Sequence, residues 1–508
     1  MHTASIFKRL LSARFRGYLF KMNKSINNGH LLFFLIIFLA TILSFSKKHN
    51  YDLQEWDESR NGVNAYEMLV TQDYINLYYN HELDTWNAKP PLFIWLIACS
   101  YKVFGFNEFA LRFPAALSTI LFFILCFYFI QLFEKKIVAF LTCLVLLSCK
   151  AVIGNHIGLT ADFDSLLILF LTASTLFFFK YVELGKSNAI FICAVFLGLA
   201  FYTKGPASFV LVPGMGLYLV VKQQLKLLKD YKLWLALGIY IAFIFSWMIL
   251  LSFFGKTSQK SYYNSGSTVE TMFYHDTYQR LTNSNFDQVN SNGKTNYLFF
   301  FEVLDARLNL WNYIFYISVI IGIWSLYKFR KNALVYIKNK ANTMTVFSIC
   351  VVTPLIIVLT LASTKNFWYL APTFMFIALI TTKAILYLAG KWKKVKIVFV
   401  LLFLFTIARH CYYLYDLPTL MHAAFTNNEI LKNKKVVVIG RLKQDLLLYL
   451  NWLKTEINFQ PTTENYKAEP GELVIFNKGQ PIKELPFKFD LVQDMQEYWL
   501  ARVIAEKH

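Results

Sequence analysis

Four carboxylates stand beside apolar runs of the sequence, where they could act as acids or bases. Asp57 and Glu58 follow the first apolar run, and Asp162 and Asp164 stand at the start of a later one. An Asp at the centre of a membrane-spanning helix costs about 2.5–3.5 kcal/mol, and less near the interface, so a carboxylate at such a boundary usually has a partner or a purpose. For a single acidic pair, a solvated loop is the simpler explanation.

Four cations occur at comparable boundaries. Arg60 follows the first acidic pair, and Lys89 precedes two prolines that restrict the backbone. Lys204 and Lys365 lie in very short turns between apolar runs, and snorkelling at a helix end explains one such lysine well. Two lysines in such short turns favour contact with an anion. A carboxylate base combined with cations is what group transfer from a phosphate leaving group requires.

His156 lies close to the second acidic pair, so a divalent metal ion is one interpretation, although a single His is more often structural. No other cofactor is indicated. The seven Cys lie in or beside apolar runs, without CxxC or His-flanked spacing. They are expected to be small buried hydrophobic side chains and not a disulfide framework.

The elements that must position these residues are membrane-spanning helices. The chain has 508 residues, of which 56% are hydrophobic and 16% charged, and its mean hydropathy is +0.42. No water-facing surface of ordinary size accommodates that balance. The net charge is +20, but Lys and Arg fall between the apolar runs, which is typical of cytoplasmic loops against anionic membrane lipids. We therefore expect no nucleic-acid partner.

Eleven apolar runs predict an all-α polytopic protein of the inner (plasma) membrane. They lie near 31–45, 115–133, 137–154, 164–180, 188–203, 206–221, 233–254, 311–327, 344–361, 367–388 and 397–412. If residues 1–30 are cytoplasmic, the short basic connections also fall in the cytoplasm, as the positive-inside rule requires. All the candidate residues then lie on the opposite, extracytoplasmic (periplasmic) side.

The extracytoplasmic connections include two long loops, at about 48–114 and 255–305. In the first loop, 61–69 and 92–104 read as helices lying along the membrane interface. The tail at 413–508 changes character, because strand patterns at 435–440 and 472–476 flank a helical pattern at 444–453. We therefore predict a membrane domain at 31–412 that carries the chemistry, followed by a small extracytoplasmic α/β domain.

Five sequence blocks, in this order, resemble the lipid-carrier-dependent glycosyltransferases of the GT-C type, family 39. This family includes protein O-mannosyltransferases and the transferases that add aminoarabinose to lipid A. The blocks are Trp56–Arg60, Lys89–Leu96 with Phe104–Pro114, Thr160–Leu167, Gly198–Pro206 and Lys365–Pro372. Each block alone is weak, but five in order are a strong resemblance.

The resemblance implies inverting transfer of a sugar from a polyprenyl-phosphate-linked donor. Asp57 would be the base, with Glu58 beside it, and Asp162 and Asp164 would shape the sugar pocket or hold a cation. The residues that would meet the carrier phosphate are Arg60, Lys89, Lys204, Lys365 and Tyr369. The acceptor stays open among a lipid such as lipid A, a cell-surface glycan and a protein.

A lipid or sugar flippase, or another transporter, is the alternative class, since it also needs many spans and charges at membrane depth. It predicts inverted repeats and broken helices near the middle of the membrane, and the hydropathy pattern contains no such repeat. The charges gather instead toward one side. A non-catalytic assembly partner fits poorly with intact carboxylates and cations.

Overall fold

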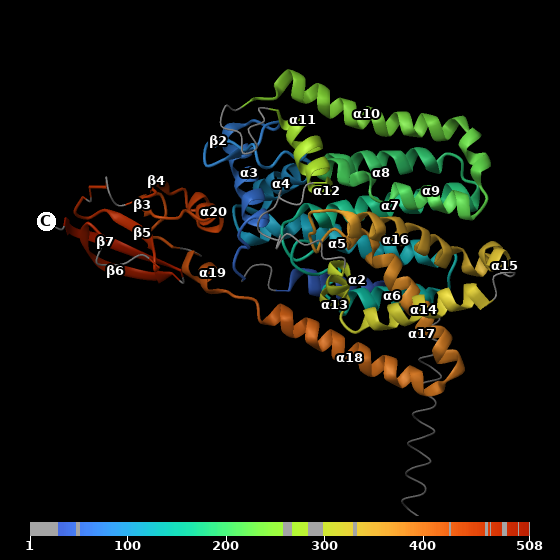
Figure 1. Cartoon of the computed structure of the whole chain (residues 1–508). Helices are drawn as coiled ribbons and strands as arrows, with labels where there is room; N and C mark the ends of the chain where they lie inside the picture. Colours follow the sequence, from blue (N-terminus) through green and yellow to red (C-terminus); the bar gives the residue numbers. More distant parts are fainter. Residues whose placement is uncertain are drawn as a thin grey trace, which may run out of the picture.

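A helical bundle and a small sheet make up the computed structural model (Figure 1). The structure describes residues 29–46, 51–257, 267–282, 298–328, 333–425, 428–462, 466–467, 469–479, 485–495 and 497–506. Most of the predicted cytoplasmic segment 1–30 and much of the predicted loop 255–305 lie outside the described residues.

In the part of the chain that the structure describes, eleven apolar helices form the bundle, and each overlaps one of the predicted apolar runs. They are α2 (Gly29–Phe45), α5 (Glu108–Gln131), α6 (Lys136–Leu147), α7 (Phe163–Leu184), α8 (Ala189–Lys204), α9 (Val212–Val221), α10 (Tyr231–Phe254), α14 (Trp311–Lys328), α16 (Thr343–Leu361), α17 (Phe374–Lys391) and α18 (Lys393–Tyr415). Among the described residues, seven segments are long and apolar enough to cross a membrane, namely those containing α5, α7, α8, α10, α16, α17 and α18. The chain is an integral membrane protein, and the count of eleven crossings stays a prediction.

Short helical segments connect these helices. They are η1 (Gly205–Phe209), η2 (Leu225–Lys229), α11 (Thr268–Glu270), η3 (Thr271–Gln279), α12 (Arg280–Thr282), α13 (Phe299–Leu308), α15 (Ala333–Lys338), η5 (Lys340–Asn342), η6 (Ala371–Thr373) and α19 (Leu420–Phe425). Local sequence sets several boundaries. The Asn107 side chain caps α5 by accepting the Ala110 N–H at 2.9 Å, and Gly185 ends α7 with a φ of 62°.

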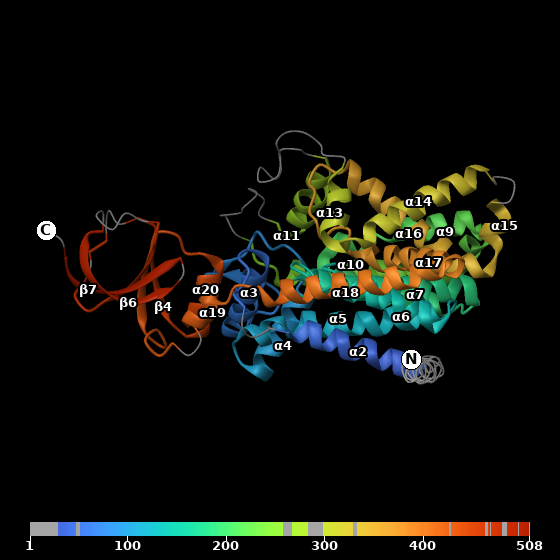
Figure 2. The same ribbon diagram turned by 90° about the horizontal axis from the view of Figure 1, so that it is seen from below.

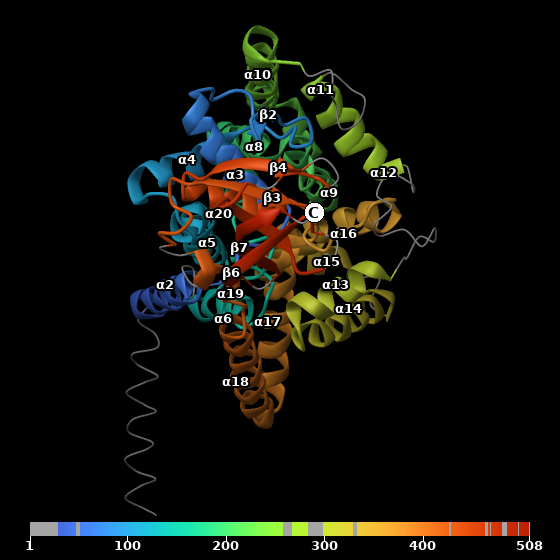
Figure 3. The same ribbon diagram turned by 90° about the vertical axis from the view of Figure 1, so that its left-hand side faces the viewer.

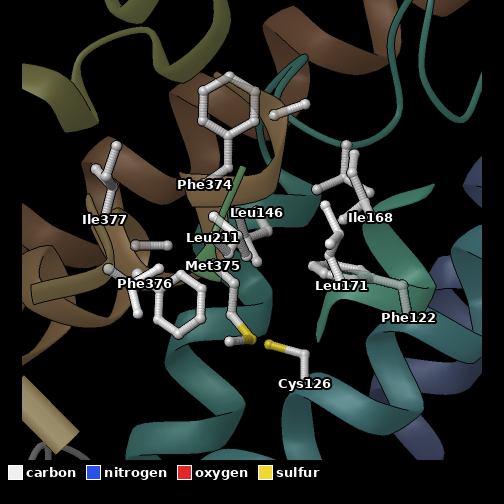
Figure 4. Packing of buried hydrophobic residues seen from close by; sticks show 14 of the residues in the cluster. Phe122, Cys126, Leu146, Ile168, Leu171, Leu211, Phe374, Met375, Phe376 and Ile377 are labelled. Carbon is white, nitrogen blue, oxygen red and sulfur yellow. The ribbon is translucent and has the colours of Figure 1, made fainter. Parts of the chain in front are cut away.

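Aromatic and sulfur-containing side chains fill the centre of the bundle. Phe347 on α16 packs against Phe179 on α7 and Phe376 on α17, with ring centroids 4.9 and 5.8 Å apart. In Figure 4 the sulfur atoms of Cys126 and Met375 face each other among these helices. Because lipid tails are as apolar as these side chains, close packing of this kind is what holds helices together in a membrane. It makes the bundle a firm support for the residues at its end.

The loop predicted at 48–114 forms a layer between the bundle and the sheet (Figures 1 and 2), and it lies partly behind the sheet in the end view of Figure 3. It contains α3 (Asp57–Thr71), α4 (Leu92–Phe104) and a hairpin of β1 (Tyr78–Tyr79) and β2 (Glu82–Leu83). Both helices predicted for this loop are therefore present. Their position along a membrane interface stays a prediction.

The C-terminal unit is a five-stranded sheet with one helix, and it projects from the end of the bundle (Figure 2). Its elements are β3 (Lys435–Ile439), α20 (Gln444–Trp452), β4 (Glu456–Gln460), β5 (Leu473–Asn477), β6 (Phe487–Met495) and β7 (Tyr498–Glu506). The strand order is β4-β3-β5-β7-β6, with β3 parallel to both of its neighbours. The predicted strands and helix correspond to β3, β5 and α20, whereas β4, β6 and β7 were not predicted.

Candidate active site

Asp57 begins α3 and faces the loop between α6 and α7. Its Oδ2 lies 3.6 Å from Nδ1 of His156, and Oδ1 of Asp162 lies 3.6 Å from the same nitrogen. Trp56, just before Asp57, has a φ of 74° and a ψ of −114°, a backbone conformation that side chains disfavour. Strain of this kind is retained where the surrounding structure fixes it, and it gathers at functional sites.

His156 is held by aromatic rings and by the two carboxylates. Its ring stacks on Trp368 with centroids 4.2 Å apart. Burial alone would lower the pKa of His156, but Asp162 and then Asp57 outweigh burial and raise it to about 10. Burial would likewise raise the pKa of Asp57, yet the contact with His156 and the charges of Lys89 and Lys204 lower it to about 2. The arrangement is a histidine ring held between two carboxylates.

The same three residues could hold a metal ion. Asp57, His156 and Asp162 each offer one ligand atom, and these atoms lie within 4.8 Å of one another. Two carboxylate oxygens and one imidazole nitrogen suit a divalent transition metal, provided that His156 has lost its proton. Without a metal, the protonated ring satisfies both carboxylates, so the geometry fits either state.

Asp164 and Lys204 form an ion pair beside this cluster. Asp164 lies in the first turn of α7 and Lys204 ends α8, and the Lys204 Nζ lies 2.6 Å from the Asp164 Oδ2. Gly205 follows with a φ of 54°, which lets the chain turn directly after Lys204. Two of the predicted residues are therefore brought together by neighbouring helices, and the Lys204 charge also acts on Asp57.

Lys89 is a predicted cation with few polar partners. Its Nζ lies 5.0 Å from the Trp86 ring centroid and 5.3 Å from that of Phe163, and it donates a 3.3 Å hydrogen bond to Asn87. It forms no ion pair within the described part of the chain, and burial lowers its pKa. Lys89 also lines a hollow that reaches Trp247 and Leu251 on α10. An anion in this hollow would pair with the Lys89 ammonium group.

Tyr369 contacts Arg280, a cation that the sequence did not predict for this region. Its hydroxyl accepts hydrogen bonds from Arg280 at 3.3 Å and from Asn366 at 3.0 Å. Arg280 also pairs with Asp276 at 3.1 Å. Arg280 lies in the predicted loop 255–305, which contains no recognised motif, so sequence offered no signal for it.

Glu58, by contrast, is saturated by the fold. Its carboxylate pairs with Arg112 at 2.6 Å, and both side chains are 0% exposed. It also accepts the backbone N–H groups of Gln54 and Ala161. Arg112 in turn donates to the carbonyls of Tyr51 and Asp52, both at 3.0 Å. This network ties the start of α3 to the loop that carries Asp162.

Arg60 and Lys365 are likewise occupied. Arg60 binds Asp84 through two hydrogen bonds of 2.9 and 2.7 Å. The Nζ of Lys365 donates to the carbonyls of Leu359, Thr360 and Ala362, at 3.1, 2.6 and 2.8 Å, and so caps the end of α16. Arg112 and Asp84 lay within predicted regions but had no predicted role, because their partners are distant in sequence.

Comparison with known proteins gives a family match over part of the chain. Residues 88–250 match the model described as dolichyl-phosphate-mannose-protein mannosyltransferase. An undecaprenyl phosphate-alpha-4-amino-4-deoxy-L-arabinose arabinosyl transferase of Aeromonas hydrophila is 31% identical over 180 residues, which are 34% of this chain and 31% of that protein. A protein of Aquifex aeolicus is 28% identical over 200 residues, 39% of each chain. The chain thus spans less than half the length of these relatives.

Solved structures match over more of the chain. ArnT from Cupriavidus metallidurans, bound to undecaprenyl phosphate, has a TM-score of 0.68 at 14% identity and covers 93% of this chain and 97% of its own. The Archaeoglobus fulgidus oligosaccharyltransferase has a TM-score of 0.50 at 12% identity, covering 87% and 68%. Residues 88–250 are therefore similar to the dolichyl-phosphate-mannose-protein mannosyltransferase family, and over most of its length the chain has the fold of ArnT.

Proposed function

We propose that this chain is a membrane glycosyltransferase that moves a sugar from a polyprenyl-phosphate-linked donor to an acceptor hydroxyl on the extracytoplasmic side. The observation that carries the proposal is the convergence of the ionised Asp57 with Lys89 and Lys204 at one end of an ArnT-like bundle. The ArnT structure with undecaprenyl phosphate bound supports a carrier of that class. The basic connections at the other end of the bundle support the sidedness.

In the proposed reaction, Asp57 accepts the proton of the acceptor hydroxyl. The acceptor oxygen then attacks the anomeric carbon from the face opposite the phosphate, so the configuration inverts. The bond between that carbon and the phosphate oxygen breaks, and its electron pair stays on the phosphate. Lys89, Lys204 and the Arg280–Tyr369 pair stabilise the charge that develops there.

The remaining predicted residues position this machinery. His156 holds Asp57 and Asp162 in one arrangement, and Asp164 orients Lys204. Glu58, Arg60 and Lys365 act in this proposal through their partners in the fold. A divalent ion at Asp57, His156 and Asp162 would supply Lewis-acid stabilisation of the sugar or its leaving group.

The test is turnover by the purified chain in lipid nanodiscs, with a panel of synthetic polyprenyl phosphate sugars and an extract of the source cell envelope as acceptor. We expect release of polyprenyl phosphate from at least one donor, with sugar appearing in the envelope fraction. Lys383→Met is a matched control that should keep its turnover. Lys383 pairs with Glu134 at a predicted cytoplasmic connection, away from the candidate site. Movement of intact donor across the bilayer without release of polyprenyl phosphate would support the flippase alternative instead.

A further inference from the structure

Arg307 lies close to the candidate site without taking part in the proposed reaction. It stands near the end of α13 and is 6% exposed. Its Nη1 donates to the Lys150 carbonyl at 3.3 Å, and its Nη2 donates to the Asn155 carbonyl at 3.0 Å. Both carbonyls belong to the loop between α6 and α7. Arg307 therefore joins the start of this loop to the residue just before His156.

The peptide unit between Asn155 and His156 is held at both of its polar atoms. Arg307 binds its carbonyl oxygen, and its N–H donates to the Thr160 hydroxyl oxygen at 2.8 Å. The Thr160 hydroxyl in turn donates to Asp162. Because a peptide unit is planar, fixing these two atoms fixes the direction in which the chain enters His156.

The backbone of His156 needs such a constraint. Its φ is 61°, in the left-handed region that residues other than glycine seldom occupy. A conformation of this kind is costly and persists only where the surrounding structure imposes it. The two hydrogen bonds to the preceding peptide unit supply part of that constraint.

The loop is shaped to admit the guanidinium group. A Cβ at Gly154 would lie 2.8 Å from the Arg307 Nη1 and 2.6 Å from the Lys150 carbonyl oxygen, so the glycine leaves room for this contact. From α18, the Tyr413 hydroxyl donates to the Asn155 Oδ1 at 2.9 Å. Asn155 is therefore held by its backbone from α13 and by its side chain from α18.

Arg307 also supports the His156 ring through an aromatic neighbour. Its Cζ lies 4.4 Å from the ring centroid of Phe367. The Phe367 ring meets the His156 ring edge to face, with centroids 5.3 Å apart, and Trp368 stacks on the same imidazole. Arg307 thus contacts both the backbone before His156 and a ring beside it.

We propose that Arg307 is a positioning residue, which holds His156 between Asp57 and Asp162 and so fixes the orientation of Asp57. The inference rests on the proposed function, in which Asp57 accepts the proton of the acceptor. The rigid, planar guanidinium group reaches two carbonyls at once, which a single lysine ammonium group does not reproduce. Arg307 itself touches neither the donor nor the acceptor.

The first test measures the position of His156 without any turnover. Diethylpyrocarbonate labels accessible imidazole rings, and mass spectrometry of the full chain from nanodiscs gives the labelling rate of each histidine. We expect Arg307→Met to raise the rate at His156 about tenfold, because the ring leaves its contacts with the two carboxylates and Trp368. The rate at the exposed His81 should not change and serves as an internal reference.

Three further variants separate positioning from folding and from charge. Arg307→Lys keeps the charge but not the paired contact, so it should label like Arg307→Met. Tyr413→Phe removes only the second tether of the loop and should raise labelling of His156 about threefold. If Arg307→Met does not fold, these two variants carry the test. Trp311→Phe is the matched control: the buried indole donates a 2.9 Å hydrogen bond at the end of α6, so its loss costs stability while labelling of His156 stays unchanged.

The second test is kinetic and uses a donor that supports turnover. Arg307→Met should lower kcat about 10–100-fold and leave the KM for the donor within about threefold, since Lys89 and Lys204 keep their places. In the background of His156→Gln, the same change should have no further effect, because the arginine acts through that ring. A merely structural role would lower kcat in both backgrounds.

Several results would overturn the inference. These are wild-type labelling of His156 in Arg307→Met, wild-type behaviour of Arg307→Lys, or a full loss of kcat on top of His156→Gln. If turnover by Arg307→Met equals that of the wild type, only this inference falls. If labelling rises as expected while no donor is turned over by the wild type, the proposed function falls, and the positioning of His156 stands.

Discussion

The two neighbouring carboxylates at the start of α3 have opposite surroundings. Asp57 is 27% exposed at its side chain and meets His156 at 3.6 Å, whereas Glu58 is 0% exposed and binds Arg112 at 2.6 Å. Residue type and position along the chain are nearly the same. What separates them is whether the fold already uses their hydrogen-bonding capacity, so the first is suited to chemistry and the second to support.

The same contrast separates two lysines that sequence assigned to one role. Lys365 donates to three backbone carbonyls, while Lys89 has one amide oxygen and two aromatic rings around it. A cation that is already satisfied gains little from a phosphate, and one that has few polar partners gains more. We therefore distinguish an open group, Asp57, His156 and Lys89, from a closed group, Glu58, Arg112, Arg60 and Lys365. Lys204 is intermediate, because it already pairs with Asp164.

The largest expected effect is on stability, from breaking the closed group. Arg112→Ala leaves Glu58 buried without a counter-ion, so we expect a loss of about 3–5 kcal/mol in the free energy of unfolding. Thermal and denaturant unfolding in mild detergent measures it. Arg441→Ala, which breaks an exposed pair with Glu55, should cost less than about 1 kcal/mol. Equal losses in the free energy of unfolding of the two variants would contradict the special role of the closed group.

A smaller effect should separate the two lysines by kinetics. Lys89→Met should raise the KM for the polyprenyl phosphate sugar or lower kcat, with kcat/KM falling about 10–100-fold, while the unfolding midpoint changes little. Lys365→Met should leave KM unchanged and lower stability by about 1–3 kcal/mol, because three carbonyls at the end of α16 lose their donor. A raised KM in Lys365→Met would return that lysine to the carrier site.

The smallest expected effect is a pH dependence at the C-terminal unit. The pKa of Asp445 is raised to about 6 in the folded chain from its usual 3.8, so the folded state binds more protons between these values. Stability therefore falls as pH rises from about 4 to about 6. Asp445→Asn removes this loss, and its midpoint should exceed that of the wild type by about 2–4 °C at pH 7 and match it near pH 4. A difference independent of pH would contradict this.

Features that depend on neighbouring residues could be predicted from the sequence, whereas contacts between distant residues could not. The helices of the bundle and the two helices in loop 48–114 follow from apolar composition and periodicity. Ion pairs are not local: Glu58 and Arg112 are 54 positions apart, and Arg60 and Asp84 are 24 apart. Sequence therefore identified groups that could meet an anion, but not which of them the fold had already paired.

The C-terminal unit shows the same limit. Its strands β3 and β5 have continuous apolar patterns, whereas β6 alternates with charged residues such as Lys488, Asp490 and Asp494 and was not predicted. Its antiparallel pairing with β7 supplies the stability that its composition does not indicate. A hollow beside Asp445 is lined by residues 52–55, by Pro418 and Met421, and by the C-terminal unit. These segments are far apart in the sequence, so no pattern along the chain predicts the hollow.

The most direct test of the central claim compares Asp57→Asn with Glu58→Gln in the polyprenyl phosphate release assay, with turnover expressed per folded molecule. Asp57→Asn should keep the wild-type unfolding midpoint and lose about 10²–10⁴-fold in turnover, since the proton acceptor is gone. Glu58→Gln should lose stability and retain most of its turnover per folded molecule. Full turnover in folded Asp57→Asn would contradict the account.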